Sequence, residues 1–126
     1  MAKTAKVSIG IGSAADFFKR SRERAAKMKR GETIASEVRI TFEDPLDMLR
    51  ALTSEKIRLV RALEGEELGI TDLANALKRD RRAVSRDVSD LESLGLIETE
   101  YRSNPGHGRH RVVRPLAKRY ELVAEF

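Results

Sequence analysis

The 126-residue sequence contains no cysteine and no tryptophan, and its only aromatic residues are four phenylalanines and two tyrosines. The lack of cysteine excludes a disulfide scaffold and a zinc site with thiolate ligands, and it suits a reducing compartment. No stretch approaches the roughly 20 apolar residues that span a bilayer, and the N-terminus lacks the apolar core of a signal peptide. We therefore expect a cytoplasmic protein with no membrane partner.

Residues for nucleophilic catalysis are also scarce. There is no Gly-x-Ser-x-Gly elbow, and the two histidines, His107 and His110, lie in one short glycine-containing stretch. Their H-x-x-H spacing can suit a metal, but no third ligand is evident and a loop fixes no coordination geometry. The sequence therefore predicts neither an enzyme nor a metal site.

A glycine pattern near the N-terminus, Gly10-x-Gly12-x-x-Ala15, follows an expected strand and opens an expected helix, as a dinucleotide-binding fingerprint does. The fingerprint needs an acidic residue about 20 positions further on. Here the first acidic residue after a following strand is Glu43, which is too far away. The first strand also alternates in polarity, and too little chain follows for a parallel nucleotide-binding sheet. We expect no cofactor, and we interpret the glycines as a tight turn.

Charged residues are abundant by contrast and make up 36% of the chain. There are 25 Lys and Arg against 20 Asp and Glu, which gives a formal charge of +5 and a pI near 9.8. The positive charge hints at an anionic partner, although the charge content alone favours an ordinary well-solvated surface. The length allows one domain, or a small domain with an extension.

The most specific pattern lies between residues 69 and 97. It has two apolar stripes at helical spacing, separated by a short polar turn, and it predicts a helix-turn-helix. Asp80 is placed to cap the second helix, residues 81–94, and Gly95 fits a left-handed cap at its end. The stripes consist of Ile70, Leu73, Ala74 and Leu77 in the first helix and of Val84, Val88 and Leu91 in the second.

The polar side of the second helix is basic and predicts contact with DNA. An α-helix fits the major groove, where Arg can donate two hydrogen bonds to guanine, so we expect Arg82 and Arg86 to contact bases. The alternative is that these arginines only solvate the helix or pair with nearby carboxylates. The predicted DNA contacts in this motif are Thr71, Lys78, Arg79, Arg81, Arg82, Ser85, Arg86 and Ser89.

A hairpin is expected after the second helix, with arms at residues 97–101 and 111–113 and a turn rich in Pro and Gly at 103–108. Such a wing, residues 102–111, can place cationic side chains on phosphates or in the minor groove. An ordinary hairpin loop without DNA contact is the alternative. The predicted contacts are Arg102, His107, Arg109 and Arg111.

Amphipathic strands and a basic helix flank this motif. Strands are expected at 7–11, 38–42 and 120–126, with a helix at 14–30 that Ser13 and Asp16 cap as a capping box. Asp44 and Thr53 are expected to cap two further helices, at 46–52 and from 53 to about 63. We expect an extension at 1–43, a DNA-binding domain at 44–114 and a C-terminal strand at 115–126 that returns to the extension. Open strand edges favour dimerisation or partner binding, although the strands can also close one sheet within a monomer.

The runs LTSEKIRLVRAL and ITDLANALKRDRRAVSRDVSDLESLGLIE resemble the winged-helix transcriptional regulators of archaea and bacteria, broadly MarR/ArsR-like. FEDPLDMLRALTSEK and ALKRDRRAVSRDVSDLESLGLI are similar to a family of small DNA-binding regulators with a strand-helix-strand extension. The resemblance implies sequence-selective DNA binding through Arg81, Arg82, Ser85 and Arg86, and it raises an antitoxin-type role with a protein partner. The chain departs from the pattern where Gly69, or a displaced Thr71, replaces the usual Ser or Thr cap.

Together these patterns predict an α+β fold: a winged helix-turn-helix with an N-terminal strand-helix-strand extension and a C-terminal strand. The expected function is sequence-specific binding of double-stranded DNA by a homodimer, most simply a repressor, with recognition helices about 34 Å apart. Two alternatives stay open. One is an antitoxin that holds a toxin and autoregulates its operon, and the other is a winged helix that binds DNA or RNA nonspecifically through phosphates.

Overall fold

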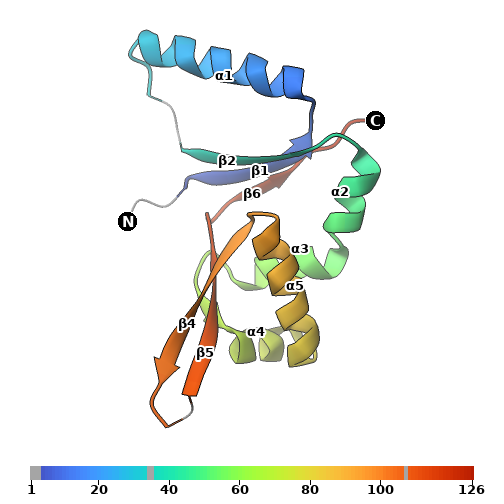
Figure 1. Cartoon of the computed structure of the whole chain (residues 1–126), viewed down its shortest axis with the longest axis vertical. Helices are drawn as coiled ribbons and strands as arrows, with labels where there is room; N and C mark the ends of the chain where they lie inside the picture. The colour runs from blue at the N-terminus through green and yellow to red at the C-terminus, as the bar shows by residue number, and fades with distance from the viewer. Residues whose placement is uncertain (1–3, 34–35, 107) are drawn as a thin grey trace. The chain divides into compact units, whose positions relative to one another are not determined.

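The computed structural model describes residues 4–33, 36–106 and 108–126 and has an α+β fold (Figure 1). The chain divides into two compact units, one made by residues up to 51 together with 119–126, the other by residues 52–118. This division differs from the expected boundary after residue 43. Helix α2 (Pro45–Ala51) belongs to the first unit because it contacts strands β1 (Lys6–Ile11) and β2 (Glu37–Phe42).

Within the described residues, the first unit is a parallel sheet of strand order β2-β1-β6 with two helices. Strand β6 (Tyr120–Leu122) pairs with β1 on the side opposite β2. Helix α1 (Ala14–Lys29) connects β1 to β2, and Figure 1 shows it running alongside the sheet. The strands expected at both ends of the chain therefore meet in one sheet within a single chain.

The two faces of this sheet differ in polarity because side chains alternate along a strand. Val7 and Ile9 of β1 are buried, as is Met48 of α2, which contacts this sheet. The strand register places Lys6 beside Glu37 and Ser8 beside Arg39 on the opposite face. The sheet thus has an apolar face and a polar face.

The capping box predicted at the start of α1 is confirmed. Ser13 Oγ accepts a hydrogen bond from the Asp16 N–H at 3.2 Å, and Asp16 Oδ2 accepts one from the Ser13 N–H at 2.9 Å. The Ser13 N–H and the Ser13 hydroxyl both donate to the Asp16 carboxylate, and these bonds hold the pKa of Asp16 below its usual value. No residue of α1 is buried, and none of the helices in the described residues is long and apolar enough to cross a membrane.

The last strand is shorter than predicted. The alternation at 120–126 suggested a strand to the end of the chain, but β6 stops at Leu122, which pairs with Ile9. The Val123 N–H still donates to the Ile9 carbonyl at 2.9 Å. Alternation shows only that a segment can face a core on one side, whereas a strand also requires a neighbouring strand to accept its hydrogen bonds.

Within the described residues, the second unit combines three helices with an antiparallel sheet of order β3-β5-β4. Its core includes the fully buried side chains of Leu59, Leu73, Val84, Val88, Leu91 and Val113. This order is the winged helix-turn-helix arrangement. Its elements are α3 (Ser54–Ala62), β3 (Leu68–Gly69), α4 (Ile70–Leu77), α5 (Arg81–Ser93), β4 (Ile97–Asn104) and β5 (Gly108–Pro115).

The wing is longer than predicted, and one strand was not predicted at all. Its arms extend to Asn104 and Gly108, which pair with each other, so the turn is shorter than the expected loop at 103–108. Strand β3 pairs Leu68 with Val113 and Gly69 with Val112. Both differences arise from hydrogen bonds between segments that are distant in the sequence. The local Pro and Gly content cannot predict such bonds.

The two ends of α5 differ in how well they were predicted. The left-handed cap at Gly95 is confirmed, since Gly95 has φ 80° and the Leu96 N–H donates to the Leu91 carbonyl at 3.0 Å. The predicted side-chain cap at Asp80 is wrong. Asp80 has the extended backbone of an N-cap, and its carbonyl accepts from the Val84 N–H, but its carboxylate makes no cap hydrogen bond. Capping needs a suitable side-chain rotamer as well as this backbone conformation.

Lys78 ends α4 in a conformation that favours glycine. Its φ is 54° and its ψ is 46°, and the Arg79 N–H behind it donates to the Ala74 carbonyl at 3.1 Å. Glycine adopts this left-handed conformation without the steric cost that a Cβ brings.

We expect Lys78→Gly to raise the free energy of unfolding of the second unit by about 0.5–1 kcal/mol, because it relieves this strain. Urea unfolding followed by circular dichroism measures the change. Lys78→Ala is the control, since it removes the charge and keeps the Cβ. A Gly variant no more stable than the Ala variant would contradict the expectation.

Candidate nucleic-acid interface

Helix α5 presents opposite faces to the core and to the surface. Val84, Val88 and Leu91 are completely buried, which fixes the rotation of the helix about its axis. Arg81, Arg82 and Arg86 are exposed as a result. The 3.6-residue period therefore places the arginines on the side of α5 that a ligand can reach.

A hollow of about 870 Å³ lies between the first turns of α4 and α5 and the wing strands. Cationic residues reach it from both sides: Arg81 and Arg82 from α5, and Arg109 and Arg111 from β5. Thr71 and Ser85, also predicted contacts, line it as well. Two carboxylates, Asp72 and Asp80, join the lining and offset part of the positive charge.

Tyr101 and Arg109 form one wall of this hollow. The Arg109 guanidinium lies over the Tyr101 ring, 5.0 Å from its centroid, which is a cation–π contact. Both side chains are exposed. The contact holds the Arg109 charge near the hollow instead of leaving it free in solvent.

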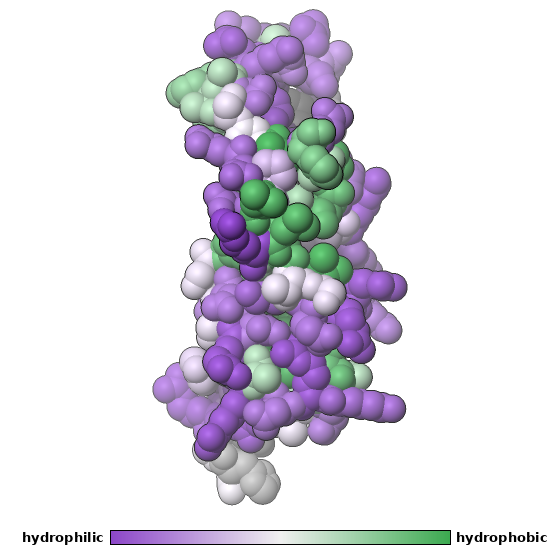
Figure 2. All heavy atoms as spheres, turned by 90° about the vertical axis from the view of Figure 1, so that its right-hand side faces the viewer, coloured by the Kyte–Doolittle hydropathy of each residue, from purple (hydrophilic) through white to green (hydrophobic). Residues whose placement is uncertain are grey.

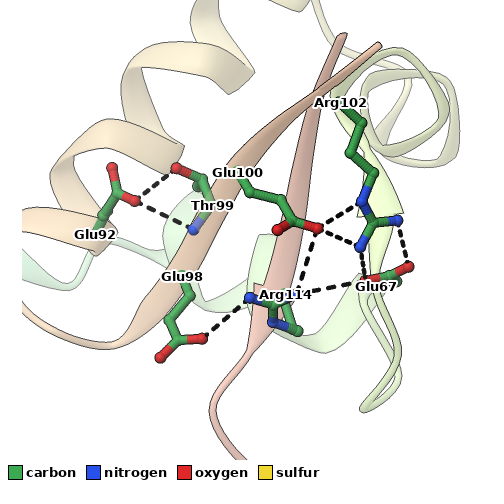
Figure 3. Close-up of polar contacts among 7 residues, drawn as sticks. All are labelled: Glu67, Glu92, Glu98, Thr99, Glu100, Arg102 and Arg114. Atoms are coloured by element: carbon green, nitrogen blue, oxygen red, sulfur yellow. Dashed lines mark hydrogen bonds and ion pairs between the residues drawn. The ribbon is translucent and has the colours of Figure 1, made fainter. Parts of the chain in front are cut away.

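Arg111 connects the wing to α5. Its guanidinium donates to Ser89 Oγ at 3.1 Å and Ser85 Oγ at 3.5 Å, and it also binds Glu92 at 3.2 Å. Its side chain is only 13% exposed. Glu92 also accepts from the Thr99 N–H at 3.1 Å and from the Thr99 hydroxyl (Figure 3). Hydrogen bonds from Arg111 thus link it to Ser85 and Ser89, and all three residues were predicted to contact DNA.

Arg102 faces away from the hollow, on the other side of the wing. Its guanidinium donates to both carboxylate oxygens of Glu67, at 2.7 and 2.9 Å, and also binds Glu100 (Figure 3). These hydrogen bonds raise the pKa of Arg102. Arg114 adds contacts to Glu98 at 3.4 Å and to Glu67 at 3.7 Å. The structure thus places Arg102 in an ion-pair network and not beside the other predicted contacts.

The remaining predicted residues lie at different places. Arg86 and Ser89 are on α5 but outside the hollow, and Lys78 is exposed at the end of α4. Arg79 pairs with Asp87 at 2.8 Å and with Glu55 at 3.5 Å, and is only 20% exposed. His107 lies outside the described residues, and no group of metal-binding side chains occurs among those that the structure describes.

We expect Arg79→Ala to lower the free energy of unfolding by about 1–2 kcal/mol, because it leaves the largely buried Asp87 carboxylate without its cation. The control is Arg58→Ala. Arg58 also pairs with Glu55, at 3.1 Å, but is 58% exposed, so its loss should cost less than about 0.5 kcal/mol. Thermal unfolding of both variants tests the difference, and equal losses would argue against a structural role for Arg79.

Sequence reasoning missed Tyr101, which lines the hollow, and considered His110, which also lines it, only as part of an H-x-x-H pair. Tyr101 lies opposite Arg111 across the hairpin, and this register places both on the face of the wing that lines the hollow. Alternation along each strand indicates which residues share a face, but the register between the strands was needed to place them together.

A protein-family model matches the whole second unit and a few residues that flank it. The family model HVO_A0114 matches residues 51–122, more than half of the 126-residue chain. The chain belongs to the HVO_A0114 family. The matching residues of this HVO_A0114 chain include all the residues that line the hollow, together with β6. Elements β1, α1 and β2 precede the matching residues. A search of curated proteins gave no match.

Several solved structures are similar to this HVO_A0114 chain. A possible transcriptional regulator from Methanosarcina mazei Go1 aligns with a TM-score of 0.50 and 18% identity, over 61% of this chain and 68% of that one. Transcriptional regulator PA4135 and NadR in complex with 4-hydroxyphenylacetate align with TM-scores of 0.40 and 0.42, at 21% and 18% identity. They match over 80% and 85% of this chain but only 64% and 66% of their own lengths.

Proposed function

We propose that this HVO_A0114-family protein is a cytoplasmic transcriptional regulator that binds double-stranded DNA in a sequence-specific manner as a dimeric repressor. The observation that carries the proposal is the hollow in which Arg81 and Arg82 of α5 and the Arg109 side chain of the wing face the same space. In this proposal α5, within residues 81–94, enters the major groove. The wing, within residues 102–111, contacts phosphates or the minor groove.

The arrangement divides the contacts into two kinds. Arg82 and Arg86 are exposed on α5, where Arg can donate two hydrogen bonds to guanine O6 and N7. Arg109 lies on the wing, where its charge would bind the phosphate backbone of DNA whatever the base sequence. Arg111 positions the wing against α5 through Ser89 and Glu92, so the two kinds of contact are held at a fixed spacing.

Features of the first unit support a homodimer. Strands β2 and β6 are the edges of its sheet, and open edges can pair with a second copy. Figure 2 shows a mostly hydrophilic surface interrupted by a cluster of apolar side chains. The exposed large apolar residues of the first unit are Phe17, Phe18, Met28, Leu46, Leu49, Leu122, Val123 and Phe126.

Anisotropy titrations test the proposal. The protein is titrated with its own upstream duplex, with a scrambled duplex and with RNA, each at two salt concentrations. We expect the highest affinity for the upstream duplex, and a fall in all affinities with salt because bound phosphates release counterions. Equal affinity for both duplexes would overturn the sequence-specific proposal, and preference for RNA would favour nonspecific phosphate binding instead.

A second candidate function is an antitoxin that holds a partner protein and autoregulates its operon. The observation that favours it is the exposed pair of Phe17 and Phe18, at 57% and 58%, whose rings meet edge to face with centroids 5.7 Å apart. Co-expression with the product of the adjacent gene, followed by mass determination, separates the candidates. A stoichiometric complex lost in Phe17→Ser/Phe18→Ser would favour the antitoxin, and a clean homodimer would favour the plain regulator.

A further inference from the structure

Helix α1 lies alongside the polar face of the first sheet and buries none of its own residues there. A helix that connects parallel strands normally buries an apolar stripe on the sheet. Here no residue of α1 is buried, and the strand register puts Lys6, Ser8, Glu37 and Arg39 on one face of the sheet. A hollow of about 830 Å³ lies between residues of α1 and residues of these strands. The hollow between α1 and the sheet is therefore lined mainly by polar residues.

Positive charge dominates the lining of this hollow. Among the described residues, two carboxylates, those of Glu23 and Glu37, line it. Three of its cations lie on α1 at positions i, i+4 and i+7, which share one helix face. The cationic residues are Lys6, Arg20, Arg24, Lys27, Arg39 and Arg119.

Half of these cations are compensated by carboxylates. Lys6 and Arg119 both pair with Glu121, at 3.3 and 3.4 Å, and Arg39 pairs with Glu37 at 3.2 Å. A hydrogen bond from Ser8, together with the charges of Arg39, Lys6 and Arg24, holds the pKa of Glu37 below its usual value, so Glu37 is ionised at neutral pH.

The other three cations lack such compensation. In the described part of the chain, Arg20, Arg24 and Lys27 form no ion pair within 4 Å. The Nη2 atom of Arg20 is buried and has no hydrogen-bond partner there. Buried polar groups normally have a partner, and like charges held together repel one another. An anion bound in the hollow would accept a hydrogen bond from Arg20 and would offset the repulsion among the three cations.

We propose that this hollow is a binding site for a nucleoside polyphosphate. Its phosphates lie among Arg20, Arg24 and Lys27 on one wall and Arg39 on the other, and its base stacks on Phe17, which lines the same hollow. From Phe17 to Lys27 the helix rises about 15 Å, enough for a base and a chain of phosphates side by side. Proteins that follow a single strand stack successive bases on several aromatic rings, whereas this lining contains one.

The glycine turn after β1 is a different place and does not suit phosphate. The Asp16 carboxylate already accepts the Ser13 N–H at the start of α1. A second hollow beside this turn is lined by the carboxylates of Asp16, Glu43 and Glu125. Phosphate there would meet like charge. The proposed site lies instead between the basic side of α1 and the polar sheet face.

The test uses the full-length protein and a fluorescent N-methylanthraniloyl derivative of ATP as the probe, without divalent cations. We expect saturable binding that unlabelled ATP displaces. Arg20→Ala/Arg24→Ala should weaken binding at least tenfold. Lys19→Ala/Arg22→Ala removes the same charge from α1 outside the hollow and should change the affinity less than threefold. Arg82→Ala/Arg86→Ala should leave nucleotide affinity unchanged, so this result does not depend on whether the second unit binds DNA.

Three further measurements make the site assignment independent of folding. Inorganic tripolyphosphate should raise the melting temperature of the native protein and of Lys19→Ala/Arg22→Ala, but not of Arg20→Ala/Arg24→Ala, whose helix content is checked by circular dichroism. Lys27→Gln, a milder change, should also weaken ATP binding. Phe17→Leu should weaken binding of ATP but not of tripolyphosphate. Absence of saturable binding, equal losses in the two double variants, or displacement of the probe by oligouridylate but not by ATP would overturn the proposal.

Discussion

Replacing Arg82 or Arg86 by alanine is expected to weaken binding to the specific duplex by about 1–3 kcal/mol for each arginine. Both side chains are exposed on α5, and Arg82 lines the hollow between helix and wing. A bidentate contact from Arg to guanine is lost with the side chain, and other base pairs provide no equivalent. Anisotropy titrations at one fixed salt concentration should therefore show a loss of preference for the specific duplex over the scrambled one.

Two comparison variants make this result interpretable. Arg61→Ala removes the same charge from α3, away from the hollow, and should leave the preference for the specific duplex unchanged. Arg109→Ala removes a wing cation and should weaken both duplexes alike, lowering the slope of log affinity against log salt by about 1. If Arg82→Ala weakened binding to both duplexes alike, the assignment of Arg82 to a base contact would be wrong.

Leu73→Ala is expected to give the largest loss of stability in the second unit, about 2–5 kcal/mol. Leu73 is completely buried in α4, a helix that contacts α3, α5 and β5, so truncation leaves a cavity at the centre of the helix-turn-helix. Since small domains are stable by only about 5–15 kcal/mol, such a loss is a large share of the total. Urea unfolding followed by circular dichroism measures the free energy.

Leu49→Ala is the matched control for Leu73→Ala. It makes the same chemical change on α2, where the side chain is 63% exposed, and should alter the free energy of unfolding by less than about 0.5 kcal/mol. A comparable loss at both positions would show that the burial of Leu73 does not determine its contribution.

Most features set by neighbouring residues were predicted from the sequence, although the side-chain cap at Asp80 was not. The caps at Ser13, Thr53 and Gly95 occur as expected, because each depends on side chains and backbone within one turn of the helix. The apolar faces of α4 and α5 were also predicted, and Leu73, Val84 and Leu91 are buried. Helical periodicity fixes which side of α5 meets the core, and so which side carries the exposed arginines.

Features that depend on distant segments were not predicted. The pairing of Gly69 with Val112 creates β3, and the register of the hairpin brings Tyr101 to the wall of the hollow. Arg102 was expected beside Arg109, but strand alternation turns it to the opposite face, where Glu67, 35 positions earlier in the chain, binds it. The sequence names each of these residues but does not show which of them the fold brings together.

The sequence by itself determined that the chain has a helix-turn-helix followed by a hairpin, and that the outer side of its second helix is basic. Local hydrogen bonds and the 3.6-residue period fix these properties without reference to the rest of the chain. Only the tertiary structure decided which cations are available to an anionic partner. Arg79, Arg102 and Arg111 pair with carboxylates from other elements, although Arg111 also lines the hollow. Arg81, Arg82 and Arg109 line the hollow and, among the described residues, form no ion pair within 4 Å. The reason is physical: the availability of a charge depends on which opposite charges the fold places within about 4 Å of it.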